Sequence, residues 1–118
     1  FDPQALFFAD FALVSHGTEA DPIFNYGNLK ALELFEMSWE ELTTLPSRLS
    51  AETTDQLERT KLLKEVSEKG FISNYSGIRV SKRGKRFKIF NATVWNVIAP
   101  DQTHLGQAAL IPNWSSIA

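Results

Sequence analysis

The change of side-chain periodicity at Gly70 is the feature that most constrains this chain. Before Gly70 the apolar residues recur at helical spacing, and Leu62, Leu63 and Val66 share one helix face with Arg59. After Gly70 the segments "FISNYSGIRV" and "FKIFNATVWNVI" alternate, "SKRGKR" and "APDQT" are turns, and "HLGQAALIPNW" is a last strand. Successive strands with short turns form an antiparallel meander.

The N-terminal half predicts short strands followed by helices. "LFFADFALVS" is interpreted as a buried strand or as a short helix plus a strand, and "PIFNYGN" as a short strand. Asn28 is expected to cap a first helix, and Ser38 with Glu41 forms a capping box for a second that stops before Pro46. A third helix is expected from about Ala51 to Lys69, with Ser50 or Thr53 as its cap.

Two early strands and three late ones, with helices between them, predict an α+β fold. We expect a five-stranded antiparallel sheet with helices packed on one face. The 118 residues fit one domain, predicted to span 1–118, and a start at Phe1 rather than Met predicts that an upstream N-terminal segment is missing.

Composition narrows the function classes. The net charge of −2 gives no general attraction to nucleic acid or to anionic membranes, and no apolar run approaches the length of a membrane span. The chain has no cysteine, which removes disulfides, thiolate nucleophiles and cysteine-ligated metals. A cysteine-free chain fits a reducing compartment, so we expect a cytoplasmic location.

Several quoted segments resemble the MEKHLA family: "SHGTEADPIFNYGN", "ALELFEMSWEEL", "LPSRLSAE", "GFISNYSGIRVSKRGKRFKI" and "TVWNV". These are PAS-like domains found alone in bacteria, algae and plants, and at the carboxyl end of class III homeodomain–leucine zipper transcription factors. The resemblance runs from about Ala9 to Trp114 and implies a PAS-like fold that senses a signal, with no general ligand or catalytic activity established. The chain contains no homeodomain or zipper, so the resemblance implies no DNA binding here.

Two arginines are the first candidate ligand-binding residues. Arg48 follows Pro46 in a segment that borders the cavity of PAS-like domains, and its planar guanidinium suits a carboxylate, a phosphate or a ring carbonyl. The alternative is that Arg48 holds the corner by bonding to helix carbonyls or to an acidic side chain. Arg59 lies on the apolar face of the third helix and needs a partner, either a ligand or a carboxylate such as Glu36, Glu40 or Asp55.

Four strand residues complete the candidate set. Strict alternation places Phe87, Asn91 and Trp95 on one face of the long strand, with the mixture of aromatic and polar groups expected of a small-molecule site. In the opposite assignment Trp95 faces outward, at a homodimer interface on the sheet. Tyr75 and Gln107 are polar candidates on neighbouring strands, where ordinary cross-strand pairing is the competing interpretation.

No cofactor or metal is identified. The resemblance to PAS-like domains suggests flavin as a cofactor to consider. The absence of cysteine excludes flavin photochemistry through a cysteine adduct. The resemblance does not favour haem, because haem-binding PAS domains use a histidine of the long helix and the third helix here contains none. His16 and His104 alone make a poor zinc set. His16 is expected to tie down its loop. The basic residues of one hairpin, Arg79, Lys82, Arg83, Lys85, Arg86 and Lys88, are interpreted as a solvated tip rather than a nucleic-acid interface.

No constellation in the sequence supports catalysis, so we expect that the protein is not an enzyme. The favoured hypothesis is a PAS-like sensory module of the MEKHLA type that binds a small ligand. The alternative is a protein interaction or dimerisation domain whose own side chains fill its core.

Overall fold

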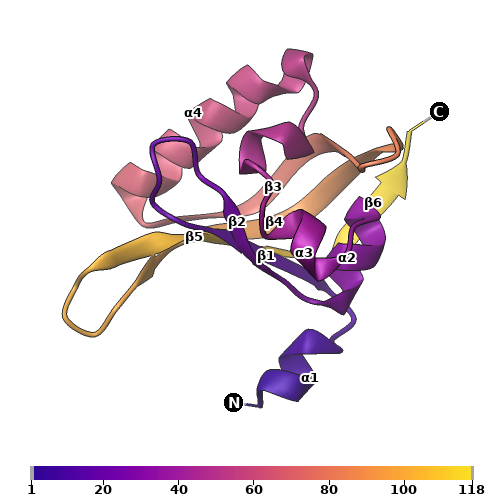
Figure 1. Ribbon diagram of the computed structural model, residues 1–118. Coiled ribbons are helices and arrows are strands. Elements are labelled where there is room, and N and C mark those ends of the chain that lie inside the picture. Colours follow the sequence, from indigo (N-terminus) through magenta and orange to yellow (C-terminus); the bar gives the residue numbers. More distant parts are fainter. Residues whose placement is uncertain (1, 118) are drawn as a thin grey trace.

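The computed structural model describes residues 2–117 and has an α+β architecture (Figure 1). Its helices are α1 (Pro3–Phe7), α2 (Leu29–Phe35), α3 (Trp39–Leu42), the 3-10 turn η1 (Ser47–Ser50) and α4 (Thr53–Lys69). Its strands are β1 (Ala12–His16), β2 (Phe24–Gly27), β3 (Phe71–Val80), β4 (Arg86–Ile98), β5 (His104–Ile111) and β6 (Asn113–Ser116).

The strands form one antiparallel sheet in the order β2-β1-β5-β4-β3. Helices α2 and α3 pack over β1 and β2, and α4 packs over β3 and β4. The predicted fold class, an antiparallel sheet with packed helices, is therefore confirmed. Among the described residues, no helix is both long and apolar enough to cross a bilayer.

The last predicted strand is divided in the structure. Pro112, which lacks a backbone N–H, separates β5 from β6. Strand β5 pairs with the second half of β4, while Asn113–Ser116 turn to pair with Phe87–Phe90 in its first half. The sheet therefore gains a short sixth strand beyond the five predicted.

Two of the three helix caps predicted from the sequence are confirmed. The Asn28 side chain caps α2, and Ser38 with Glu41 forms the predicted capping box of α3. The expected cap of α4 is wrong: α4 begins after Glu52 without a side-chain cap. The hydroxyl of Ser50 donates instead to the Ser47 carbonyl inside η1.

Paired irregularities in β3 and β4 decide which side chains face the helices. Asn74 and Asn91 both have positive φ angles, 56° and 59°, and the pairing register shifts beside each of them. Each bulge adds one residue, so the face of the strand switches there. Phe87 and Ile89 are buried before the switch in β4, and Ala92 and Val94 after it.

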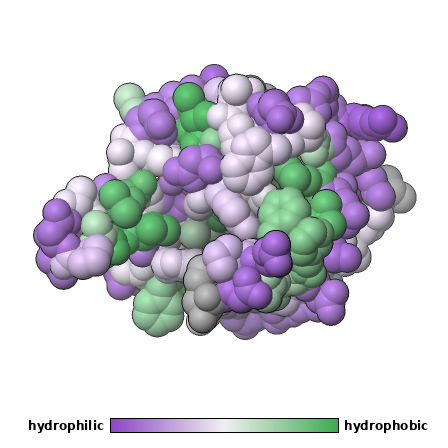
Figure 2. All heavy atoms as spheres, turned by 60° about the horizontal axis from the view of Figure 1, so that its bottom comes forward, coloured by the Kyte–Doolittle hydropathy of each residue, from purple (hydrophilic) through white to green (hydrophobic). Residues whose placement is uncertain are grey.

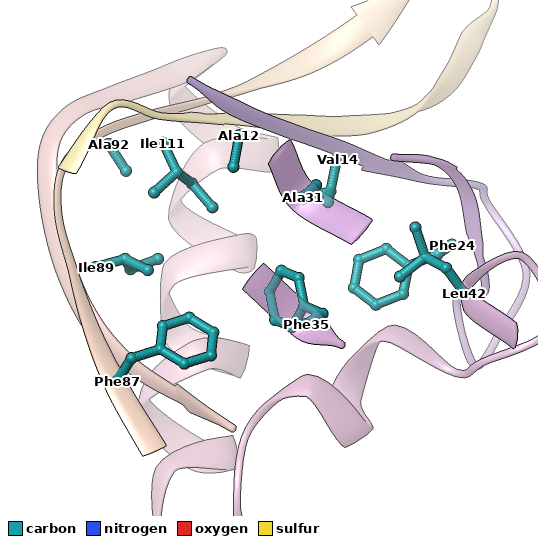
Figure 3. Close-up of a cluster of buried hydrophobic side chains, with 10 residues drawn as sticks. All are labelled: Ala12, Val14, Phe24, Ala31, Phe35, Leu42, Phe87, Ile89, Ala92 and Ile111. Atoms are coloured by element: carbon teal, nitrogen blue, oxygen red, sulfur yellow. The ribbon is translucent and has the colours of Figure 1, made fainter. Parts of the chain in front are cut away.

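The core consists of two clusters rather than one. The larger joins β1, β2, α2 and the first half of β4 around Phe24, Phe35 and Phe87, whose side chains point toward one another (Figure 3). The smaller contains Leu62 and Val66 of α4 and Val94 of β4. This division leaves room between the clusters, where the candidate site lies.

Asn28 connects three segments through a fully buried side chain. Its Oδ1 accepts from the Leu13 N–H at 2.9 Å and from the Ala31 N–H at 3.1 Å. Its Nδ2 donates to the carbonyls of Phe11, at 2.8 Å, and Leu6, at 3.2 Å. One side chain therefore caps α2 and fixes the approach to β1.

We predict that Asn28→Ala lowers the free energy of unfolding by about 2–4 kcal/mol, because it removes a helix cap and leaves buried backbone groups without partners. Ser38→Ala is the matched control. It removes an exposed cap from α3 and should cost only about 1 kcal/mol. Urea denaturation followed by circular dichroism measures both, and equal losses would show that the buried connections add nothing to the cap.

Candidate functional site

A cavity of about 60 Å³ lies between the two core clusters. Most of its lining is aliphatic or aromatic and comes from members of both clusters. Its polar lining includes His16 of β1, Ser50 of η1, Arg59 of α4, Tyr75 and Arg79 of β3, and Gln107 of β5. Side chains from both the helical layer and the sheet therefore meet in one small space.

A hydrogen-bonded chain runs along one side of this cavity. Arg59 Nη2 donates to Ser47 Oγ, which lies 2.9 Å from His16 Nδ1. His16 Nε2 lies 3.1 Å from Gln107 Oε1. Gln107 Nε2 donates to the Leu63 carbonyl at 3.1 Å, which identifies Oε1 as an acceptor. Neutral His16 therefore carries its proton on Nε2 and accepts from Ser47 through Nδ1.

Burial holds His16 in this neutral form. Its side chain is 7% exposed, and desolvation lowers its pKa below the ordinary value of 6.5. The hydrogen bond to Gln107 and the charge of Glu19 raise the pKa, whereas the positive charge of Arg59 and a smaller effect of His104 lower it. A proton on Nδ1 would reverse the Ser47 bond and add positive charge next to Arg59.

A second polar group lies on β3. Arg79 donates to the Tyr75 hydroxyl at 3.2 Å, and its guanidinium carbon lies 5.7 Å from the Tyr75 ring centre. The Tyr75 hydroxyl donates in turn to Glu58 Oε1 at 2.7 Å. Gly77 lies between them on the same strand face, and a Cβ there would overlap the Tyr75 hydroxyl and lie 3.0 Å from Arg79 Nη1. The absent side chain gives this pair its space.

Arg59 and Arg79 bring unbalanced positive charge to the cavity. They are 8% and 7% exposed, and none of the ion pairs among residues 2–117 includes either. Burial, with a further contribution from repulsion by Arg79, lowers the pKa of Arg59 to about 10. Arg59 nevertheless stays protonated near neutral pH, so the cavity favours an anionic group.

The structure brings three of the six predicted site residues to the cavity: Arg59, Tyr75 and Gln107. Arg48 lies elsewhere, because its Nε pairs with Asp21 Oδ1 at 3.1 Å and about half of its side chain is exposed. That contact matches the alternative in which Arg48 holds the corner through an acidic side chain. Arg59 bonds to Ser47 rather than to the carboxylates proposed from the sequence.

Asn91 and Trp95 lie away from the cavity. Alternation placed both on the face of Phe87, but the bulge at Asn91 ends that alternation. Asn91 is exposed and donates to Asn74 Oδ1 at 2.9 Å. The two neighbours of Trp95 in the chain face the helices: Val94 is buried, and Asn96 donates through Nδ2 to the carbonyl of Val66 in α4. Trp95 therefore points to the outer face of the sheet.

Four polar residues of the site were not among the ligand candidates: His16, Ser47, Ser50 and Arg79. Arg79 was assigned to the basic hairpin, although Tyr75, Gly77 and Arg79 alternate along one strand face, a signal that is present in the sequence. Ser47 and His16 are separated by 31 positions, so only the folded chain reveals their contact.

The basic hairpin is less uniform than its sequence suggests. Arg79 points inward, Lys82 pairs with Glu41, and Arg86 Nε lies 2.6 Å from Glu52 Oε1. These contacts divide the charge among the cavity and two helix termini. The hairpin therefore does not present one continuous positive face.

Comparison with known proteins gives a family and a fold. The family model described as the MEKHLA domain matches residues 2–116. The homeobox-leucine zipper proteins ATHB-14 and ATHB-9 of Arabidopsis thaliana are each 27% identical over 103 residues, covering 85% of this chain. The chain spans only 12% of the length of those relatives.

Solved structures show a similar fold at low sequence identity. A PAS domain from Colwellia psychrerythraea has a TM-score of 0.78 at 16% identity, covering 97% of this chain and 92% of its own. A light-oxygen-voltage domain studied with a flavin analogue has a TM-score of 0.75 at 13% identity, covering 98% and 83%. An RNA-binding light-oxygen-voltage receptor has a TM-score of 0.76 at 16% identity, covering 92% and 30%.

The cavity does not fit a flavin. Pockets for drug-sized ligands occupy about 300–1,000 Å³, whereas this cavity measures about 60 Å³. A tricyclic flavin ring therefore has no room between α4 and the sheet in this conformation. The chain also lacks a cysteine for a covalent adduct.

We predict that the stability of the protein falls as the pH drops through about 6.5, the ordinary value of a histidine pKa. The folded state lowers the pKa of His16, so the unfolded state binds more protons in this window and is favoured by acid. Thermal denaturation between pH 7.5 and 5.5 measures the effect.

The matched variants are His16→Gln and His104→Gln. Replacing His16 should flatten the pH dependence, whereas replacing the exposed His104 should change it much less, because His104 has the smallest influence among the groups that shift the pKa of His16. An unchanged slope in the His16 variant would show that other groups cause the acid sensitivity.

Proposed function

Because this chain belongs to the MEKHLA domain family and has a PAS-like fold, we propose that it is a sensory module that binds a small molecule between its helices and its sheet. The observation that carries this proposal is the convergence of buried polar groups on a cavity inside an otherwise apolar layer. Binding sites for small molecules combine apolar walls with a few placed polar groups.

The polar chain along the cavity supplies a mechanism for a response. Arg59 belongs to α4, Ser47 to η1, His16 to β1 and Gln107 to β5, so their contacts join the helical layer to the sheet. A ligand that bonds to one member changes the partners available to the next. Its preference for one arrangement shifts the population of α4 and η1 positions relative to the sheet.

The site supports binding rather than catalysis. Ser47 approaches His16 in a way that superficially resembles a nucleophile and its base. However, Ser47 is fully buried, accepts a hydrogen bond from Arg59, and is not part of the cavity lining. A catalytic serine must reach the reacting atom of its substrate. We therefore propose a non-catalytic module.

We predict that a screen of small polar molecules by heteronuclear NMR identifies ligands, and that the chemical-shift changes they cause in the protein map to α4, β3 and β5. Ala109→Leu should abolish this binding without unfolding the protein, because the longer side chain occupies the space that Ala109 lines. Ala20→Leu makes the same change at an exposed position and should bind normally. The proposal fails if the wild type binds nothing, or if Ala109→Leu binds as well as the wild type.

A second candidate function is association with a copy of itself through the outer sheet face. Trp95 lies on that face, and Ile98 and Leu105 near the β4–β5 hairpin are 52% and 50% exposed. Figure 2, which brings the underside of Figure 1 forward, shows separate hydrophobic areas, one of them on the projecting hairpin. An exposed apolar surface marks an interaction site where it forms a contiguous patch.

We predict that sedimentation velocity across a concentration series detects a dimer that Trp95→Ala weakens, because the substitution removes a large aromatic contact. Trp39→Ala is the control, since Trp39 is 40% exposed on α3 and contacts the Tyr26 ring edge to face. A wild-type protein that stays monomeric throughout, or equal effects of both variants, would count against this interface.

A further inference from the structure

Two buried arginines line the cavity, and neither forms an ion pair with a carboxylate among residues 2–117. Arg59 comes from α4 and Arg79 from β3, so each is held by a different layer of the fold. Across residues 2–117, the ion pairs formed by arginine involve only Arg48 and Arg86. A buried charge is costly unless it is paired, and here two like charges line one space.

The neutral partners of these arginines satisfy only part of each guanidinium. A guanidinium has five N–H donors, and the hydrogen bond found for Arg59 uses one, toward Ser47. Arg79 donates to the Ile78 carbonyl and to the Tyr75 hydroxyl. The negative charge of Glu58 reaches Arg79 only through that hydroxyl. Donors therefore remain for a group that enters the cavity.

The size and lining of the cavity narrow the class of that group. A volume of about 60 Å³ accommodates only a few heavy atoms. Leu62, Ile89 and Val94 belong to its apolar wall. A strongly hydrated inorganic anion would lose water against these side chains without replacement, whereas a short hydrocarbon would bury favourably there. The planar guanidinium matches the geometry of a carboxylate.

We propose that the cavity binds a short-chain monocarboxylate, with its carboxylate group held by Arg59 and Arg79 and its hydrocarbon part against Leu62, Ile89 and Val94. This inference rests on the proposed ligand-binding function and specifies its ligand class. The carboxylate lies beside the hydrogen-bonded chain that begins at Arg59. Its binding draws α4 toward β3, because the two arginines belong to those elements.

Propionate and propionamide provide the direct test, because they have nearly the same shape and differ in charge. Heteronuclear NMR titrations at constant ionic strength measure both dissociation constants on the wild-type protein. We expect propionate to bind at least about tenfold more tightly than propionamide. Hydrogen bonds to charged groups contribute more free energy than neutral ones, and the difference corresponds to about this factor in affinity. Inorganic phosphate, the third probe, should bind more weakly than propionate.

Substitutions then test whether Arg59 and Arg79 are the residues that bind the carboxylate. Arg59→Gln and Arg79→Gln should each raise the Kd of propionate at least about tenfold and leave that of propionamide within twofold of wild type. Arg48→Gln makes the same change at an arginine outside the cavity and should leave both values unchanged. If one cavity variant fails to fold, the other variant and the wild-type comparison decide.

The outcomes separate this inference from the proposed function. Equal binding of propionate and propionamide overturns the anionic ligand class but keeps a ligand-binding cavity. Tighter binding of phosphate than of propionate overturns the carboxylate assignment. If the Arg48 variant loses as much affinity as the cavity variants, the effect is general electrostatics and the assigned residues are wrong. Absence of binding by every small molecule screened overturns the proposed function as well.

Discussion

The contact between Ser47 and His16 is the interaction on which the site depends. Ser47 belongs to the short 3-10 turn η1, in which Leu49 is 44% exposed, yet Ser47 itself is completely buried. It receives a hydrogen bond from Arg59 and meets His16, which continues to Gln107. One chain of hydrogen bonds therefore positions the turn, α4 and two strands. In this chain each residue donates to the next, which requires that His16 is neutral and accepts through Nδ1.

This polar chain also explains why the core is divided. Aromatic side chains gather on the side of α2, and aliphatic ones gather under α4. Arg59 and Arg79 both line the cavity between the clusters, where a charge without a partner disfavours direct contact between apolar side chains. Buried polar groups in an otherwise apolar core are typical of functional sites. The same feature connects the proposed ligand to the elements that would move.

Local sequence chemistry predicted most of the fold because the relevant signals act over a few residues. Asn28 caps α2, Ser38 with Glu41 caps α3, and α4 ends before Gly70 as expected. Local prediction failed at the start of α4, in the alternation of β4 beside Asn91, and at the end of the last strand. The start of α4 has no side-chain cap, since Ser50 bonds inside η1. The last strand breaks at Pro112, and its remainder pairs with a distant part of β4.

The sequence by itself determined the order of the main strands and helices, the α+β class, and the need of Arg59 for a partner on an apolar helix face. Only the tertiary structure decided which polar groups meet. The bulges at Asn74 and Asn91 reset the strand faces, turning Trp95 outward. Arg48 forms an ion pair with Asp21, whereas Arg79 lines the cavity. The physical reason is that periodicity describes one segment, whereas the partner of a buried charge is set by the packing of distant segments.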